Sequence, residues 1–278
     1  MRRYVLNHKE MSVQVTEWGS ANTPVVFCLH GLGSTGLSFI EIAEKLKDKY
    51  RLISIDAPGH GNTPPFNSSV SYELPHMAVW LDKLFDLLKI EDFYFLSHSW
   101  GSFAALYYLV LFPNRVKGSL LIDGGYQTKH RMTKTLEEEI AHYEQDFNEY
   151  RFAAWQEFLA AEQAVYTRWS PLLEKAVRDL GREKNGGIIW HASGETAKHI
   201  ILAMHKHETA DIYSLLQKKN ILLLTPKNEN SYYQETRQRF VEQTGAEMRT
   251  VPHTTHLLHW DKPALVAETV IELWPVNP

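Results

Sequence analysis

The sequence predicts an α/β protein, a doubly wound and mostly parallel sheet with a helical segment inserted into it. Over most of the 278 residues, short apolar runs typical of buried strands alternate with segments whose apolar residues recur at helical spacing. This alternation stops after Gly125 and resumes near residue 208. We therefore predict two parts, a core formed by residues 1–125 and 208–278 and an inserted helical cap, or lid, at 126–207.

The first half of the chain supplies most of the predicted core. Apolar or alternating runs predict strands at residues 3–7, 11–18, 25–29, 51–55, 93–96 and 116–122. Apolar residues at spacings of three and four predict helices over 39–46, 71–89 and 100–113. The run at 25–29 is continuously apolar, as expected of a parallel strand that is buried on both faces.

The second half begins with segments that show only helical patterns. Residues 136–147 place apolar side chains on one face, and Thr135 and Glu138 have capping-box spacing. Ser170-Pro171 opens a further helix that we expect Gly181 to end, 185–187 form a loop, and 195–205 a last helix of the cap. Strands at 221–225 and 247–251, each followed by a helix (232–244 and 263–274), complete the core.

The composition excludes several function classes. Lysine and arginine number 29 and aspartate and glutamate 33, so no nucleic-acid or membrane surface is expected. Cys28 is the single cysteine; it lies in an apolar run as a buried thiol, and a reducing, cytoplasmic location is expected. The chain has no signal-peptide pattern and no run of about 18 apolar residues.

No cofactor is expected. The sequence has neither a phosphate-binding G-x-x-x-x-G-K-[ST] loop nor a dinucleotide glycine fingerprint. His199, His205 and His207 have no matching carboxylate motif, so we interpret them as a solvated helix face rather than a metal site.

Ser99 occupies the turn that organises the predicted core. It lies in Ser97-His98-Ser99-Trp100-Gly101, between an apolar strand and an Ala/Leu/Tyr-rich helix. A direct change from strand to helix strains the backbone at the bend and requires small residues two positions before and after it. The serine is then held beside a helix N-terminus, whose dipole favours developing negative charge, so Ser99 is the candidate nucleophile.

A serine nucleophile needs a base within hydrogen-bond reach. His256 follows the last predicted strand, on a loop from which a side chain reaches back over the edge of the sheet. His253 and His259 are nearby rivals, but His253 lies close to the strand end and His259 at the start of the next helix. His256 is therefore the candidate base.

Four motifs in this order resemble the α/β-hydrolase superfamily, in its cap-bearing, serine esterase-like branch. The matching segments span nearly the whole predicted core and are His30-Gly31-Leu32-Gly33, Asp56-Ala57-Pro58-Gly59-His60-Gly61, Ser97-x-Ser99-x-Gly101 and His256 with Asp261-Lys262-Pro263. The family more often has glycine at position 97, and serine keeps that position small. The resemblance implies an oxyanion hole made by the backbone N–H groups of Leu32 and Trp100.

The resemblance leaves two candidates for the acid of the triad. The family usually places it after the strand predicted at 221–225, where Glu229 stands 27 residues before His256. Asp123 ends the preceding core strand, from which some relatives take their acid. Glu229 is the preferred acid and Asp123 the alternative.

The implied function is a hydrolase that cleaves a carboxylic ester of a small or medium, partly apolar substrate through an acyl-enzyme, without a cofactor. Tyr126, Trp155, Trp169 and Trp190 are candidates for lining its pocket, against the alternative that they pack within the cap. Other chemistries of the fold remain open, including lactonase, thioesterase, C–C hydrolase and, because Ser99-Trp100-Gly101-Ser102 is similar to it, proline iminopeptidase activity. From a different class, a non-catalytic ligand-binding protein also remains open. The oligomeric state is not predicted.

Overall fold

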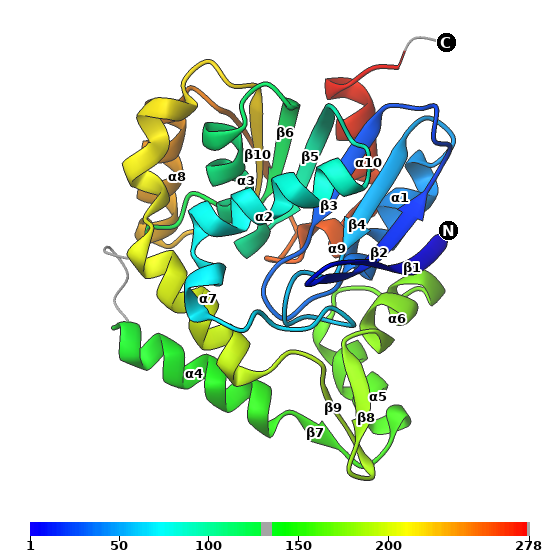
Figure 1. The fold of residues 1–278 in the computed structure, drawn as a ribbon. Coiled ribbons are helices and arrows are strands. Elements are labelled where there is room, and N and C mark those ends of the chain that lie inside the picture. The colour runs from blue at the N-terminus through cyan, green and yellow to red at the C-terminus, as the bar shows by residue number, and fades with distance from the viewer. Residues whose placement is uncertain (129–134, 277–278) are drawn as a thin grey trace.

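An eight-stranded sheet forms the centre of the computed structural model, which describes residues 1–128 and 135–276. The strands lie in the order β1-β2-β4-β3-β5-β6-β10-β11 (Figure 1). The pairs β1–β2 and β2–β4 are antiparallel, and the pairs from β4 to β11 are parallel. The predicted mostly parallel α/β sheet is therefore confirmed. The strands are Arg2–His8 (β1), Met11–Trp18 (β2), Val25–Leu29 (β3), Arg51–Ile55 (β4), Phe93–His98 (β5), Val116–Ile122 (β6), Ile221–Pro226 (β10) and Glu247–Val251 (β11).

Helices cover both faces of this sheet. One buried cluster joins the sheet to α2, α3 and α8, and a second joins its other face to α1 and α10. Among the described residues, no helix combines the length and the hydropathy needed to cross a membrane. The helices of the core are Ile40–Leu46 (α1), Leu74–Leu87 (α2), Trp100–Leu111 (α3), Ser231–Thr244 (α8), Leu258–Asp261 (α9) and Pro263–Leu273 (α10), with 3₁₀ helices at Gly36–Phe39, Ser69–Tyr72 and Thr209–Leu216.

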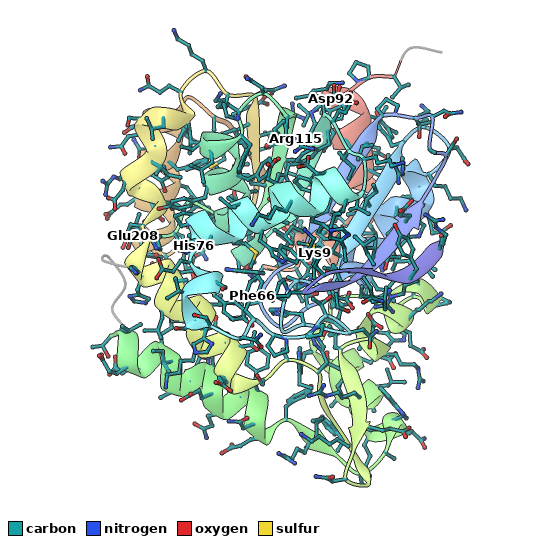
Figure 2. The ribbon with its side chains drawn as sticks, in the orientation of Figure 1. Lys9, Phe66, His76, Asp92, Arg115 and Glu208 are labelled. Atoms are coloured by element: carbon teal, nitrogen blue, oxygen red, sulfur yellow. The ribbon has the colours of Figure 1, made fainter. Side chains whose placement is uncertain are left out.

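The carboxyl ends of the parallel strands face the segment that is inserted between β6 and β10. Asp92 and Arg115 directly precede β5 and β6, and Figure 2 shows both at the upper end of the sheet. The two strands therefore run downward in this view, toward the inserted elements in the lower part of Figure 1. Open α/β sheets bind ligands at the carboxyl ends of their strands, so the insertion lies where it can cover a site.

The insertion contains a small antiparallel sheet, so the prediction of helices alone was wrong. Strand β9 pairs with both β7 and β8, and β8 begins at Gly181, where we expected only the end of a helix. The boundaries of the cap at 126 and 207 stay a prediction. The elements of the insertion are Leu136–Glu149 (α4), Arg151–Phe152 (β7), Trp155–Val165 (α5), Pro171–Arg178 (α6), Gly181–Lys184 (β8), Gly187–Trp190 (β9) and Gly194–Lys206 (α7).

Ion pairs connect the residues that flank α6 in the insertion to the core. Arg3 of β1 lies 2.6 Å from Asp179, at the end of α6, and 3.2 Å from the buried Asp56, which follows β4. Arg168, just before α6, pairs with Glu41 of α1. This part of the insertion is therefore held at two separate points of the core.

Candidate active site

Ser99 lies at a sharp turn between β5 and α3. Its backbone has φ 51° and ψ −123°, a strained conformation for a residue with a side chain. A Cβ atom at Gly101 would lie 2.5 Å from the carbonyl oxygen of Leu29, so α3 approaches β3 too closely for any larger residue. The hydroxyl of Ser97 lies 3.0 Å from that of Ser102, so a small polar residue fits at position 97. The predicted geometry of this turn is present.

His256 lies within hydrogen-bond distance of Ser99. Its Nε2 is 2.9 Å from Oγ of Ser99, and its side chain is 50% exposed. Asp261 holds the loop by accepting hydrogen bonds from the backbone N–H and the hydroxyl of Thr255. His98 donates from Nε2 to the carbonyl oxygen of His256, over 2.9 Å.

The side chains of the two rival histidines, His253 and His259, do not face Ser99: one is bonded elsewhere and the other is exposed. The ring of His259 is buried, with its Nε2 2.8 Å from the hydroxyl of Ser38. His253 is exposed and adopts a positive φ of 56° at the end of β11.

Asp123, and not the preferred Glu229, is the carboxylate that contacts His256. Nδ1 of His256 lies 2.7 Å from Oδ2 of Asp123, whose side chain is 5% exposed. Glu229 is 77% exposed and pairs with Lys227. The loop after β10 directs Glu229 to solvent, whereas the turn after β6 lies beside Ser99, because Ser99 N–H donates to the carbonyl oxygen of Ile122.

The hydrogen bonds determine where the protons lie. A carboxylate only accepts, so Nδ1 of His256 carries a proton and donates to Asp123, and Nε2 is free to accept from the hydroxyl of Ser99. Burial by itself raises the pKa of Asp123, but His256, Tyr126 and Arg237 favour its charged form and the net pKa is lowered. Asp123 is therefore ionised at neutral pH.

The predicted oxyanion turn passes directly over Ser99. A Cβ atom at Gly31 would lie 3.0 Å from Cβ of Ser99. The carbonyl oxygen of Gly31 accepts hydrogen bonds from Nδ1 of His30, over 2.7 Å, and from the backbone N–H of Ser34, over 3.1 Å. Because this carbonyl shares a peptide plane with the N–H of Leu32, both bonds orient that N–H. The N–H of Trp100 belongs to the first turn of α3, where it has no partner within the helix.

The aromatic residues predicted for the pocket have different positions. Tyr126 is fully buried and its hydroxyl donates to Oδ1 of Asp123. Nε1 of Trp190 donates to the carbonyl oxygen of Gly33, over 2.7 Å, which places its ring beside the oxyanion turn. The indoles of Trp155 and Trp169 bond to Glu183 and Glu174 within the insertion.

We had expected the histidines in and directly after α7 to form a solvated helix face. Instead, they contact other parts of the protein. His205 pairs with the buried Glu139 of α4, and His207 pairs with Glu73, just before α2. The ring of His199 lies 5.6 Å from that of Tyr72. Over residues 1–128 and 135–276, no group of three or more histidine, cysteine, aspartate or glutamate side chains has an arrangement that suits a metal ion.

The structure places two further residues beside Asp123 and His256 that the sequence did not single out. Arg237 of α8 contacts Asp123, and His98 packs against His256 with ring centroids 4.8 Å apart. No local motif marks Arg237, because its partner lies 114 positions away. His98 could have been singled out from the sequence, because it directly precedes Ser99 in the strand-turn-helix segment.

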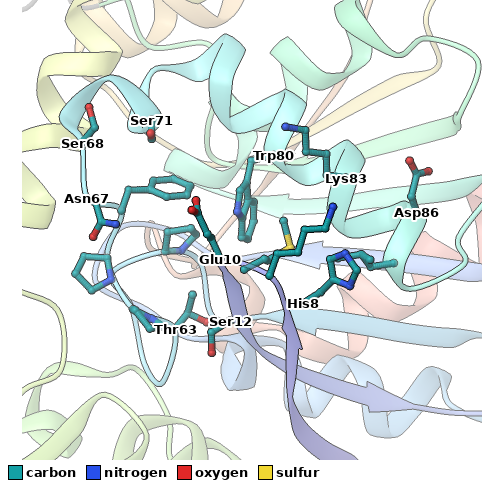
Figure 3. Close-up of a pocket in the computed structure, with 17 residues that line it drawn as sticks. His8, Glu10, Ser12, Thr63, Asn67, Ser68, Ser71, Trp80, Lys83 and Asp86 are labelled. Atoms are coloured by element: carbon teal, nitrogen blue, oxygen red, sulfur yellow. The ribbon is translucent and has the colours of Figure 1, made fainter.

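A broad surface groove lies apart from these residues. It has a volume of about 840 Å³ and is bordered by the β1–β2 turn, the loop after β4 and α2 (Figure 3). Trp80 and Phe66 form an aromatic wall, and Lys83 lies nearby. None of the residues that line it belongs to the Ser99–His256–Asp123 arrangement.

Known proteins include relatives of this chain that are described as serine hydrolase-like. A serine hydrolase-like protein of Danio rerio is 25% identical over 221 residues, which cover 74% of this chain and 66% of that protein. A serine hydrolase-like protein of Homo sapiens is 29% identical over 106 residues, 38% of this chain and 52% of that protein. The chain thus spans about half to two thirds of the length of these relatives.

Solved structures share the fold over nearly the full chain. A thioesterase domain from the curacin biosynthetic pathway matches with a TM-score of 0.80 and 18% identity, covering 98% of this chain and 99% of that one. E-2-(acetamidomethylene)succinate hydrolase matches with a TM-score of 0.83 and 17% identity, covering 99% of both. The family model described as alpha/beta hydrolase fold matches residues 24–263. The chain therefore belongs to the alpha/beta hydrolase family.

Proposed function

We propose that the protein is a serine hydrolase that cleaves a carboxylic ester through an acyl-enzyme, with Ser99, His256 and Asp123 as its triad. The observation that carries this proposal is the continuous series of hydrogen bonds from Asp123 through His256 to Ser99, at distances of 2.7 and 2.9 Å. A hydroxyl at a strained turn, with an imidazole in the accepting tautomer beside it, is the arrangement that an activated serine requires.

In the proposed reaction, Oγ of Ser99 attacks the ester carbonyl while Nε2 of His256 takes the hydroxyl proton. The carbonyl oxygen becomes an oxyanion, which the N–H groups of Trp100 and Leu32 stabilise. As the intermediate collapses, His256 gives its proton to the leaving alcohol and Ser99 keeps the acyl group. Water, deprotonated by His256, then attacks the acyl-enzyme, and His256 returns the proton to Oγ of Ser99 as the bond to the acyl group breaks and the acid leaves. Asp123 stabilises the imidazolium in both half-reactions.

The insertion supports a partly apolar substrate. Phe147 of α4 and Trp190 of β9 pack against each other, with ring centroids 5.8 Å apart, and both approach Gly33 in the oxyanion turn. We propose that the segment 126–207 acts as the cap, and that these two aromatic residues border the space next to the scissile bond. Trp155, whose indole bonds to Glu183, is not part of this proposal.

Labelling by a fluorophosphonate probe tests the catalytic class. We expect the wild type to be labelled at neutral pH and Ser99→Ala to remain unlabelled, with Ser102→Ala as a control that keeps a serine at position 99. A non-catalytic ligand-binding protein would show no Ser99-dependent labelling.

A panel of substrates tests which kind of bond the protein cleaves. We expect the highest kcat/KM for acyl esters of short or medium chain length, compared with lactones, thioesters, C–C bond substrates and proline arylamides. A preference of more than tenfold for another class would contradict the ester proposal and leave the serine mechanism standing.

A further inference from the structure

A buried arginine contacts the acid of the proposed triad. Arg237 lies on α8, its side chain is 6% exposed, and it reaches the turn after β6. Nη2 donates to Oδ1 of Asp123 over 3.0 Å, and Nη1 donates to the carbonyl oxygen of Pro226 over 2.9 Å. The end of β10, where we had expected the acid itself, therefore supplies an acceptor for this guanidinium.

The two oxygens of Asp123 have separate partners. Oδ2 accepts from His256, whereas Oδ1 accepts from Arg237 and, over 2.6 Å, from the hydroxyl of Tyr126. Nη2 of Arg237 also lies 3.0 Å from that hydroxyl. Three donors from three parts of the chain thus fix the plane of the carboxylate, so that Oδ2 points at His256.

Aromatic packing fixes the guanidinium in turn. Its carbon lies 5.1 Å from the ring centroid of Tyr126 and 5.6 Å from that of Tyr233. An arginine that bonds through two nitrogens and lies over aromatic rings has little freedom to rotate, which lysine does not reproduce. Arg237 is therefore organised before any substrate binds.

The other titratable groups around this pair do not supply a positive charge. His98 from β5 and His259 from α9 lie behind His256, and burial lowers the pKa of both, so they are neutral. Burial also favours the neutral form of Tyr126, because it raises the pKa of the hydroxyl, which stays protonated. Among the described residues that contact Asp123, Arg237 is thus the permanent cation, and a buried carboxylate without such a partner is costly.

We propose that Arg237 is a positioning residue of this site, which holds the Asp123 carboxylate ionised and aimed at Nδ1 of His256. The proposal rests on the proposed serine hydrolase function. Arg237 touches neither Ser99 nor the reacting bond in this arrangement, so it acts through Asp123 alone.

Kinetics of Arg237→Met test this role. We expect kcat to fall about tenfold to a hundredfold because the carboxylate loses its alignment, while KM stays within about twofold. Arg239→Met removes a charge from the same helix at a partly buried position and is the matched control, with unchanged kcat. In an Asp123→Asn background, Arg237→Met should cause no further loss. An equal loss in both backgrounds would show a merely structural role and overturn the proposal.

A measurement without substrate separates this proposal from the hydrolase function. NMR of the free enzyme should show the proton on Nδ1 of His256 as a downfield resonance in the wild type and in Arg239→Met. In Arg237→Met this resonance should be lost or broadened, because the carboxylate is no longer aimed at Nδ1. An unchanged resonance in the folded Arg237→Met variant would overturn the proposal. This readout holds even if the wild type fails to react with the fluorophosphonate probe, a failure that would refute only the proposed function.

Arg237→Lys keeps the test available if the methionine variant does not fold. Lysine retains the charge but only part of the geometry, so we expect a kcat within about tenfold of the wild type and a downfield Nδ1 proton resonance of His256 that is still observed. Loss of this resonance in the folded lysine variant would contradict the role of the charge.

Discussion

Replacing Asp123 by asparagine separates the two carboxylates that the sequence offered as the acid. In the folded protein, Oδ1 of Asp123 accepts hydrogen bonds from Tyr126 and Arg237, and the guanidinium of Arg237 can only donate. An asparagine must therefore keep its oxygen on that side and turn its NH2 group toward His256. His256 then has to accept at Nδ1 and carry its proton on Nε2, which removes the acceptor for the hydroxyl of Ser99.

The expected size of this effect follows from the loss of the correct tautomer. Without an accepting Nε2, the serine is no longer activated by its base, and kcat should fall by about a thousandfold to ten-thousandfold, or about 4 to 5.5 kcal/mol. The fold should persist, because the asparagine oxygen still accepts from both donors. The matched control is Glu229→Gln, whose side chain is 77% exposed and contacts Lys227, so its kcat should stay within about twofold.

Steady-state hydrolysis of a chromogenic ester measures both variants, with circular dichroism to confirm folding. A kcat for Asp123→Asn within tenfold of the wild type would refute the tautomer argument. A fall of more than tenfold for Glu229→Gln would show that the loop after β10 moves to supply the acid after all.

The remaining predictions concern the acid stability of the fold and the packing around Ser99. Burial lowers the pKa of four histidines to about 3, so they are neutral in the folded protein and take up protons on unfolding; these are His30, His60, His191 and His259. The unfolded state binds more protons between their ordinary pKa of 6.5 and about 3, so stability should fall with decreasing pH by about 1.4 kcal/mol per pH unit for each histidine. The buried Asp56, with its pKa raised to about 6, opposes this as a single group, and urea midpoints that stay constant from pH 7 to 5 would contradict the prediction. Gly124→Ala should lower kcat by about a hundredfold, because its Cβ would lie 2.2 Å from the carbonyl oxygen of Ser99 and displace the turn. Gly186→Ala, which has no atom within 4 Å, should leave kcat unchanged, and equal kcat values for the two variants would refute the packing argument.

Local patterns predicted much of the core, and they singled out Ser99 and His256, two of the three residues of the proposed triad. The apolar runs predicted the strands of the large sheet, and the small residues around Ser99 predicted a turn that does adopt φ 51°. Helix ends were less accurate, since the helix expected over 71–89 divides into a 3₁₀ turn and α2, Leu74–Leu87. His256 was selected because a loop after the last parallel strand ends at the same edge of the sheet as Ser99.

A local sequence signal marks the hairpin in the small sheet of the insertion. Asn185 and Gly186 both adopt positive φ, 51° and 77°, and join β8 to β9 as a two-residue hairpin turn. Asn-Gly is the strongest short signal for such a hairpin. The strand β8 itself, Gly-Arg-Glu-Lys, has no apolar alternation, because its side chains are largely exposed.

The choice of acid depended on contacts that no local pattern contains. Asp123 and Glu229 are both carboxylates that follow strands of the parallel sheet and precede His256 in the chain, so local patterns offer both as the acid. Only the register of β5 on β6 brings the turn at Asp123 against Ser99, and only the packing of α8 brings Arg237 to that carboxylate. Local periodicity and strain at a single turn are properties of residues that are neighbours in the sequence, so the sequence by itself determines them. The partner of His256 depends on distances between strand ends, and these exist only once the sheet has assembled.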